Sequence, residues 1–438
     1  MKISCAVVSF VAFLASSSVK AANPTECVTD FDANTDYFPD KVVVESSEHW
    51  SITYENSYKI VRNDAAGTSY LLYQCGTPPP QDAGQHDAVV PVPLGDFGVH
   101  YTSFIAYVEL LGLRSSITAV GGQAAWIYSP CLNKMIDQDM VDVVSDINNA
   151  TIVADVGVSQ DVPFFVGSSS HVFDDGFEVT EWMETNQLAT FEWIKFFSVF
   201  FNREKEANML FDAAMDRTEC AKNNAGILSA DKEKPVILWG YYSGCGGWDV
   251  AQSCPNYYCE LADTCGATLL TSMEGSVDAQ ETCFRNYMTT EEFVAFGKDA
   301  DIWIYPGRDL DTILSQYSDD LKDFVSVKNN KVYDVAGQTF DAWSAERKTE
   351  PDTLIQDFCS VVGNENPSTP TPHQLTFLRH VDDAVASPAV CTDATAPLQK
   401  LGSECVPVVV NQGGNDESSA SAAKTMAAFI LAAAATLL

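Results

Sequence analysis

The chain has 438 residues, and its 25 Lys and Arg against 60 Asp and Glu give a formal net charge of -35 at pH 7. This length suits two lobes of roughly 150 residues each better than one core. The charge argues against nucleic acid or an anionic membrane surface as the main partner, because phosphate contacts need clustered cations.

The first residues have the layout of a secretory signal peptide. Lys2 precedes an apolar run at 3–14, and small residues follow up to Lys-Ala-Ala at 20–22. Residues 1–22 are therefore predicted to be removed, and the mature chain is expected in an oxidising compartment. Asn149-Ala150-Thr151 is an N-glycosylation sequon in an expected surface loop.

Cysteine usage agrees with secretion. Without Cys5 of the signal, the count is an even twelve, which favours disulfides, although their connectivity cannot be deduced. These cysteines are Cys27, Cys75, Cys131, Cys220, Cys245, Cys254, Cys259, Cys265, Cys283, Cys359, Cys391 and Cys405. The group at 245–265 lacks the paired C-x-x-C of a zinc knuckle, so disulfides are favoured there over a metal site.

The first lobe, predicted at 23–187, opens with short β-rich runs. Residues 41–45, 50–61 and 69–73 predict a small antiparallel sheet, and 89–94 predicts a buried strand. A loop at 98–103, a helix at 104–111 capped by Gly112, and a strand at 117–120 form an α/β unit. The segments 151–155 and 163–167 complete this lobe.

Two consecutive helices are predicted between the lobes, at 188–224. The second, at about 203–223, is expected to be about 30 Å long at about 1.5 Å per residue, and Asn202 is placed to cap its start. A helix of this length bridges two small lobes. The pattern therefore predicts a cleft between them.

The second lobe, predicted at 225–372, repeats the pattern of the first. Its elements are a strand at 235–242, helices at 257–261 and 291–297, a strand at 300–305, a hairpin at 325–335 around Asn329-Asn330, and a helix at 351–361. A C-terminal helix and a disulfide-rich extension are expected at 373–410.

Loops that leave the carboxyl ends of strands lie at the ligand crevice of α/β units. Aromatic and polar residues recur in or near such loops in both halves of the chain. The candidate ligand-binding residues are Tyr101, Thr102, Ser103, Trp126, Tyr128, Tyr241, Tyr242, Trp248, Tyr305, Arg308 and Trp343. For each aromatic alone, an equal alternative is a packed core side chain.

Two of the polar loop residues have specific alternatives. His100 is a weak candidate axial ligand to a metal centre, against the more frequent satisfied loop histidine. Arg308 follows a predicted strand and suits an anionic group of a ligand, with a surface salt bridge as the equal alternative.

Several stretches together resemble the extracytoplasmic substrate-binding proteins that bind cobalamin, siderophores and haem, whose two lobes are joined by one rigid helix. The resemblance covers roughly 41–384 and rests on YVELLG at 107–112, EWIKFF at 192–197 with EAN at 206–208, DADIWI at 299–304, VKNNKVY at 327–333 and PDTLIQD at 351–357. It implies a two-lobed α/β fold with a single long linker helix.

The secretory start, the cysteines and the acidity narrow the resemblance to the cobalamin acquisition proteins of marine algae. It implies cobalamin as the ligand, no catalysis, and a membrane transporter or endocytic receptor as the partner. A corrinoid is a large flat disc rimmed with amides, so its site needs aromatic walls and a few polar contacts. A ferric siderophore or haem remains the alternative ligand.

A secreted hydrolase is the further alternative. The chain has no H-E-x-x-H, G-x-S-x-G or Walker loop, but its carboxylate pairs are too many to exclude a glycosidase. A structural or adhesive surface protein would not need two lobes joined by a helix.

The C-terminal residues 411–438 have the layout of a GPI-attachment signal. Gly413, Gly414 and Asn415, then small residues at 418–423 and Lys424, precede an apolar tail at 426–438, which is too short for a spanning helix of about 20 residues. The sequence thus predicts a cell-surface protein held by a lipid, and a tail anchor is the less favoured alternative.

Overall fold

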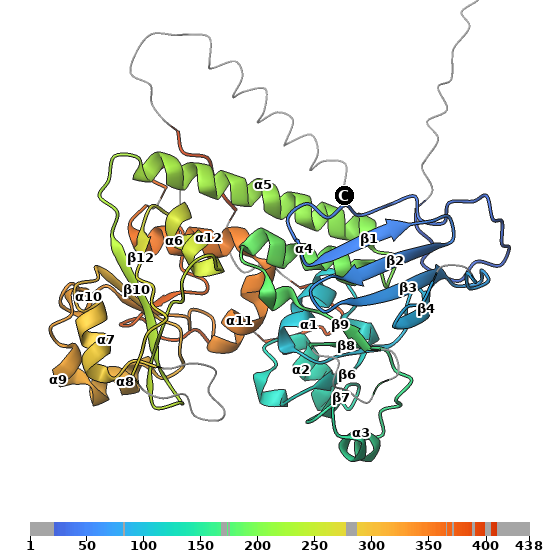
Figure 1. Ribbon diagram of the computed structural model, residues 1–438, viewed down its shortest axis with the longest axis horizontal. Coiled ribbons are helices and arrows are strands. Elements are labelled where there is room, and N and C mark those ends of the chain that lie inside the picture. Colours follow the sequence, from blue (N-terminus) through green and yellow to red (C-terminus); the bar gives the residue numbers. More distant parts are fainter. Residues whose placement is uncertain are drawn as a thin grey trace, which may run out of the picture.

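The computed structural model describes residues 22–81, 84–167, 173, 176–276, 287–364, 366–369, 372–387, 390–398 and 404–409. The predicted lipid-attachment signal and all but the last residue of the predicted signal peptide lie outside them. The protein has the two-lobed, helix-linked α/β fold that the resemblance implies (Figure 1). Across the described part of the chain, no helix is both long and apolar enough to cross a membrane.

The N-terminal lobe contains two sheets. The first has the order β1 (Trp50–Tyr54), β2 (Tyr58–Asn63), β3 (Thr68–Gln74) and β4 (Ala88–Val92), and only its β3–β4 pair is parallel. The second is parallel throughout, in the order β7 (Asp142–Val144), β6 (Ile117–Gly121), β5 (Phe97–Val99), β8 (Phe164–Val166) and β9 (Gly176–Glu178). The predicted strand at 41–45 is absent from the first sheet.

Helices cover the parallel sheet of this lobe. They are α1 (Thr102–Leu110), α2 (Pro130–Asp137) and α3 (Ala150–Val156), with 3-10 turns η1 (Arg114–Ser116), η2 (Ala124–Trp126) and η3 (Glu181–Met183). The predicted segment at 151–155 is thus helical, and Asn149 caps it by accepting from the backbone N–H groups of Thr151 and Ile152.

Two helices link the lobes, as predicted. The first, α4 (Gln187–Ser198), is buried over almost its whole length. The second, α5 (Glu204–Ser229), has 26 residues and is about 39 Å long at about 1.5 Å per residue, so it extends beyond the predicted end. It runs along one side of both lobes (Figure 1). Its N-cap is Arg203, while Asn202 has a left-handed φ of 54°.

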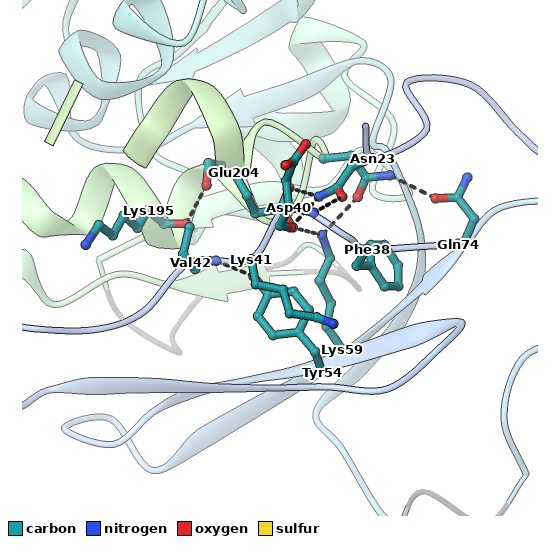
Figure 2. A network of polar contacts seen from close by, with 12 residues as sticks. Asn23, Phe38, Asp40, Lys41, Val42, Tyr54, Lys59, Gln74, Lys195 and Glu204 are labelled. Carbon is teal, nitrogen blue, oxygen red and sulfur yellow. Dashed lines mark hydrogen bonds and ion pairs between the residues drawn. The ribbon is translucent and has the colours of Figure 1, made fainter. Parts of the chain in front are cut away.

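The start of α5 is fastened to the first sheet by a buried polar network (Figure 2). The Nζ of Lys59 lies 2.5 Å from Oε1 of Glu204 and 2.9 Å from Oδ1 of Asn202. Asn23 donates to Oε2 of Glu204, and Asn202 donates to Gln74. Because these groups satisfy one another out of contact with water, the helix leaves the N-terminal lobe in one fixed direction.

The C-terminal lobe has one mixed sheet. Its order is β11 (Gly247–Val250), β10 (Val236–Ser243), β13 (Ile302–Tyr305), β14 (Val332–Asp334) and β15 (Arg379–His380), with β12 (Thr268–Leu269) also paired with β10. Its helices are α6 (Tyr257–Thr264), α7 (Thr290–Gly297), α8 (Leu310–Gln316), α9 (Ser318–Leu321), α10 (Val325–Lys328), α11 (Phe340–Ala345) and α12 (Pro351–Val362), with the 3-10 turn η4 (Glu346–Thr349).

The predicted hairpin at 325–335 is wrong. Its first arm is helix α10, and its second arm, β14, pairs in parallel with β13. The turn at Asn329-Asn330 is present, with Asn330 at a φ of 53°, but it joins a helix to a strand. In the described part of 373–410, the predicted C-terminal helix is likewise absent, and β15 adds an edge strand instead.

The C-terminal strap, residues 390–398 and 404–409, connects the lobes after β15. Cys391 is disulfide-bonded to Cys131 of α2, and Cys405 to Cys220 of α5. The remaining disulfides between described residues join Cys27 to Cys75, Cys254 to Cys259 and Cys265 to Cys359, and Cys245 is also disulfide-bonded. The prediction that the cysteines at 245–265 form disulfides is confirmed.

Candidate functional site

The N-terminal half of the candidate site is built at the carboxyl ends of β5, β6 and β8. Tyr101 follows β5 directly and is the N-cap residue of α1. Its ring lies 4.4 Å from that of His100 and 5.5 Å from that of Phe104, centroid to centroid. The side chain is nevertheless 41% exposed, so part of it remains available for a ligand.

Gly167, which follows β8, lets the backbone approach this ring. A Cβ atom at Gly167 would lie 2.1 Å from Cε2 of Tyr101, a distance that real side chains do not adopt. Any larger residue would displace the phenol ring. The absence of a side chain at Gly167 therefore determines the position of the Tyr101 ring at the edge of the sheet.

Trp126 is the second aromatic of this half. It ends the 3-10 turn η2, which follows β6, the neighbour of β5 in the sheet. The turn has no buried residue, and Trp126 is 51% exposed. An indole left in water at the carboxyl end of a strand is a surface that a flat apolar ligand would cover.

The C-terminal half is built at the carboxyl ends of β13 and β14. Arg308, beyond β13, lies with its Nη2 2.5 Å from Oδ1 of Asp341. Its guanidinium also lies 4.1 Å from the ring centroid of Phe340. Phe340 and Asp341 begin helix α11, after the loop that leaves β14. Arg308 is therefore a paired cation, although its side chain is half exposed.

The two halves are brought together by helix packing. Helix α11 and the turn η4 pack against α1, the helix that starts after Tyr101. Tyr128 forms a buried cluster with Ala342 and Ala345 of α11. Burial raises the pKa of the Tyr128 phenol to about 12. Tyr128 is therefore a contact between the lobes and not an exposed wall.

Two predicted wall residues lie in the core of the C-terminal lobe. Trp248 is 1% exposed, and its ring stacks on Phe293 with centroids 4.0 Å apart. Tyr305 is fully buried, and its hydroxyl donates to Asp309 over 2.6 Å. Burial and the Asp309 carboxylate raise the pKa of Tyr305 strongly. Neither ring faces a ligand, so the predicted pairing of these two with Tyr101 and Trp126 is not found.

Of the other predicted site residues, two are buried and three are half-buried. Ser103 is buried and donates to Glu181, and Trp343 is buried against Trp239. The half-buried Tyr241 and Tyr242 pack on Tyr305 and Trp248 respectively. Thr102, half-buried at the first turn of α1, stays beside Tyr101.

The candidate residues at these strand ends are therefore Tyr101 and Trp126 in the N-terminal lobe and Arg308, Phe340 and Asp341 in the C-terminal lobe, with His100 and Thr102 next to Tyr101 in sequence. Phe340 and Asp341 were not predicted as site residues. The segment 325–335 was predicted as a hairpin, so the loop that follows the parallel strand β14 was not recognised as a strand end facing a ligand. Among the described residues, no group of three or more His, Cys, Asp or Glu is placed to hold a metal ion. The arrangement suits binding of a large apolar surface.

Comparison with known proteins gives distant relatives. No protein-family model matches the chain. An uncharacterized lipoprotein of Methanocaldococcus jannaschii is 25% identical over 326 residues, which is 69% of this chain and 74% of that protein.

Solved structures with a similar fold include a periplasmic heme binding protein of Pseudomonas aeruginosa, with a TM-score of 0.49 and 14% identity over 67% of this chain and 100% of that chain. A periplasmic heme-binding protein of Roseiflexus has a TM-score of 0.45 and 11% identity over 61% of this chain and 98% of that one. At these levels of similarity, neither assigns a ligand to this chain.

Proposed function

We propose that this protein binds cobalamin at the cell surface for uptake and performs no catalysis. The observation that carries the proposal is the pair Tyr101 and Trp126, exposed on neighbouring loops at the carboxyl ends of β5 and β6. A flat corrinoid would cover both rings, and the resemblance to the cobalamin acquisition proteins of marine algae supports this ligand.

The charged side chains at the candidate site favour a neutral ligand over an anionic one. Haem and many ferric siderophores carry carboxylates, which need cations at their site. At the described loop ends, the guanidinium of Arg308 is already paired with Asp341, and Asp309 lies next to it in sequence. The amide rim of cobalamin needs hydrogen-bonding groups and no additional cation. Haem or a ferric siderophore is the alternative ligand.

His100 belongs to the proposal as a candidate axial ligand. Its imidazole lies beside Tyr101, and neutral imidazole is a common donor to metals. Removal of this donor in His100→Ala should change the visible spectrum of bound cobalamin if the imidazole reaches cobalt.

The proposed setting is the outer face of the plasma membrane. A signal peptide at 1–22, a lipid attached near 413–421 and a glycan on Asn149 together give a surface protein. The proposed partner is a membrane transporter or endocytic receptor that takes the ligand on.

The test is a titration panel with cobalamin, hemin and a ferric siderophore, read by calorimetry and by visible absorbance after gel filtration. Co-elution of cobalamin colour with the protein, and weaker binding by Trp126→Ala, are expected. Binding of hemin alone would replace the ligand by the alternative. Turnover of a glycoside or ester with no binding of any chelate would favour the hydrolase.

A further inference from the structure

The two lobes meet through buried charged side chains. The turn η4 of the C-terminal lobe packs against α1 of the N-terminal lobe. At one end of this contact, Lys348 of η4 donates to Oε1 of Glu181 over 2.5 Å, and Ser103 of α1 donates to the same oxygen over 2.8 Å. This end is an ion pair of one cation and one carboxylate, and burial lowers the pKa of the Lys348 ammonium.

The other end of the contact has more carboxylates than cations. Glu109 of α1 is 2% exposed, and its Oε1 accepts from Nε of Arg114 and from Oγ of Ser129. Its Oε2 is buried and has no hydrogen-bond partner among the described residues. The guanidinium of Arg114 also donates to the carbonyl oxygens of Ala394 and Ala396 in the C-terminal strap.

Glu346, the first residue of η4, faces this group from the other lobe. It is 4% exposed, and it lines a cavity of about 430 Å³ together with Arg114, Ser129 and the strap. The charged and titratable groups around it are Glu109 on α1, Arg114 on η1, Tyr128 before α2, Glu350 before α12, Asp393 on the strap, and Arg347 and Lys348 on η4 itself.

We propose that Glu346 and Glu109 form a proton-dependent latch between the lobes, closed while the pair holds one proton. Arg114 donates to Glu109 and lines the same cavity as Glu346, so the two buried carboxylates have one nearby guanidinium and repel each other when both are ionised. Lobe separation would let water reach both, so the doubly ionised pair favours the open form. The cavity lined by Glu346 gives water and protons a route to its carboxyl group.

The direction of the pH effect follows from the raised proton affinity of the Glu346 carboxylate in the closed form. Burial, together with Glu109 and Glu350, raises the pKa of Glu346 to about 8 in the closed form. In the open form the carboxyl returns toward its ordinary 4.5. The closed form is therefore favoured fully below about pH 4.5 and loses that advantage as the pH rises to about 8, by up to about tenfold per pH unit.

The latch bears on the binding site through the helices that carry it. Helix α1 begins immediately after Tyr101, and α11, which runs into η4, begins at Phe340. When α1 and η4 separate, these two rings separate as well. Acidification would thus hold the site together, and alkaline conditions would loosen it.

The test is hydrogen exchange of the α1 and η4 amides in the full secreted protein without ligand, between pH 6 and 9. After correction for the intrinsic pH dependence of exchange, protection should fall by up to about tenfold per pH unit up to about pH 8 in the wild type. In Glu346→Gln protection should be higher at pH 8 and should fall less steeply with pH, because only Glu109, with its raised pKa, and Lys348, with its lowered pKa, still titrate at this contact. Glu55→Gln, at an exposed turn, is the matched control and should follow the wild type.

Constant protection in the wild type would overturn the latch, as would an unchanged pH slope in Glu346→Gln. If Glu346→Gln is not secreted, Glu346→Met is measured in its place and should show the same shallower fall. Because no ligand is added, the outcome is independent of the proposed cobalamin binding.

Discussion

Lys348 and Glu181 are 167 positions apart in sequence, yet Nζ of Lys348 lies 2.5 Å from Oε1 of Glu181 across the lobe boundary. The Glu181 side chain is fully buried, and that of Lys348 is 12% exposed. A buried pair of this kind adds little net stability over a matched apolar pair. It becomes costly when one partner is lost, because the other charge then remains in the interior.

We therefore expect Lys348→Met to lower the free energy of unfolding by about 3 kcal/mol. The double variant Lys348→Met, Glu181→Gln should lose less than Lys348→Met alone, because no buried charge is then left unpaired. Urea unfolding at pH 7 measures both. Lys322→Met removes the exposed pair with Asp319 and should change nothing measurable. Equal losses in the single and the double variant would contradict this account.

Two tryptophans distinguish ligand contact from core packing. Trp126→Ala should leave the fold intact and weaken cobalamin binding by roughly thirtyfold, which is about 2 kcal/mol for one aromatic wall. Trp248→Ala should lower the free energy of unfolding by about 3 to 5 kcal/mol and reduce secretion, because its ring is stacked inside the C-terminal lobe. Melting curves and calorimetric titrations of both variants provide the comparison. Unchanged cobalamin affinity in Trp126→Ala would remove the indole from the site.

The sequence was sufficient for the large elements of the fold. The apolar stretch of α4 and the helix formers of α5 predicted the link between the lobes, because helix formation depends on neighbours three and four positions away. The hairpin at 325–335 failed because β14 pairs with a strand distant in sequence, and the local turn signal at Asn329-Asn330 says nothing about that partner.

The candidate site was less predictable than the fold. Strand β13 is buried on both faces, so the position of Tyr305 at its end does not tell whether the ring points to the core or to a ligand. Trp248 was placed in a loop after the predicted strand at 235–242, whereas it lies in β11, which pairs antiparallel with β10. The exposure of Tyr101 and Trp126 could be predicted, because both follow strands at the carboxyl edge of the sheet, and their contact with a ligand stays a prediction.

The proposed lipid attachment gives a simple expectation for the cell. Deletion of residues 425–438 removes the apolar tail that the attachment machinery reads, so the protein should appear in the medium. A GPI-cleaving phospholipase should release the intact protein from cells. Retention of the truncated form on membranes, or resistance of the intact form to the phospholipase, would favour a tail anchor.

Asn149 combines a predicted glycan with a helix cap, and the two roles can be separated. Thr151→Ala destroys the sequon but leaves the Oδ1 of Asn149 free to accept from the α3 backbone. We expect Thr151→Ala to lose one glycan on gels without loss of stability. Asn149→Ala should lose the glycan and, in addition, about 1 kcal/mol from the missing cap. Identical gel mobility of wild type and Thr151→Ala would show that the sequon is not used.

The C-terminal strap gives the last prediction, through the disulfide between Cys131 and Cys391. These cysteines are 260 positions apart, so their bond closes a very long loop in the unfolded chain. In the chain-entropy account, the stabilisation from a disulfide grows with the logarithm of loop length. The paired change Cys131→Ser, Cys391→Ser should therefore lower the free energy of unfolding by about 5 to 6 kcal/mol in this account.

The matched control is the disulfide between Cys254 and Cys259, which closes a loop with a sequence separation of only 5. Its paired replacement by serine should cost about 2 kcal/mol in the same account. Without the Cys131–Cys391 disulfide, the strap should also be attached less firmly to the first lobe. The amides around Ala394 should then exchange faster, although Arg114 still donates to the Ala394 carbonyl. Urea unfolding and hydrogen exchange of the two double variants measure these effects. Equal destabilisation by both replacements would mean that local contacts of the strap, and not the length of the loop it closes, determine its contribution.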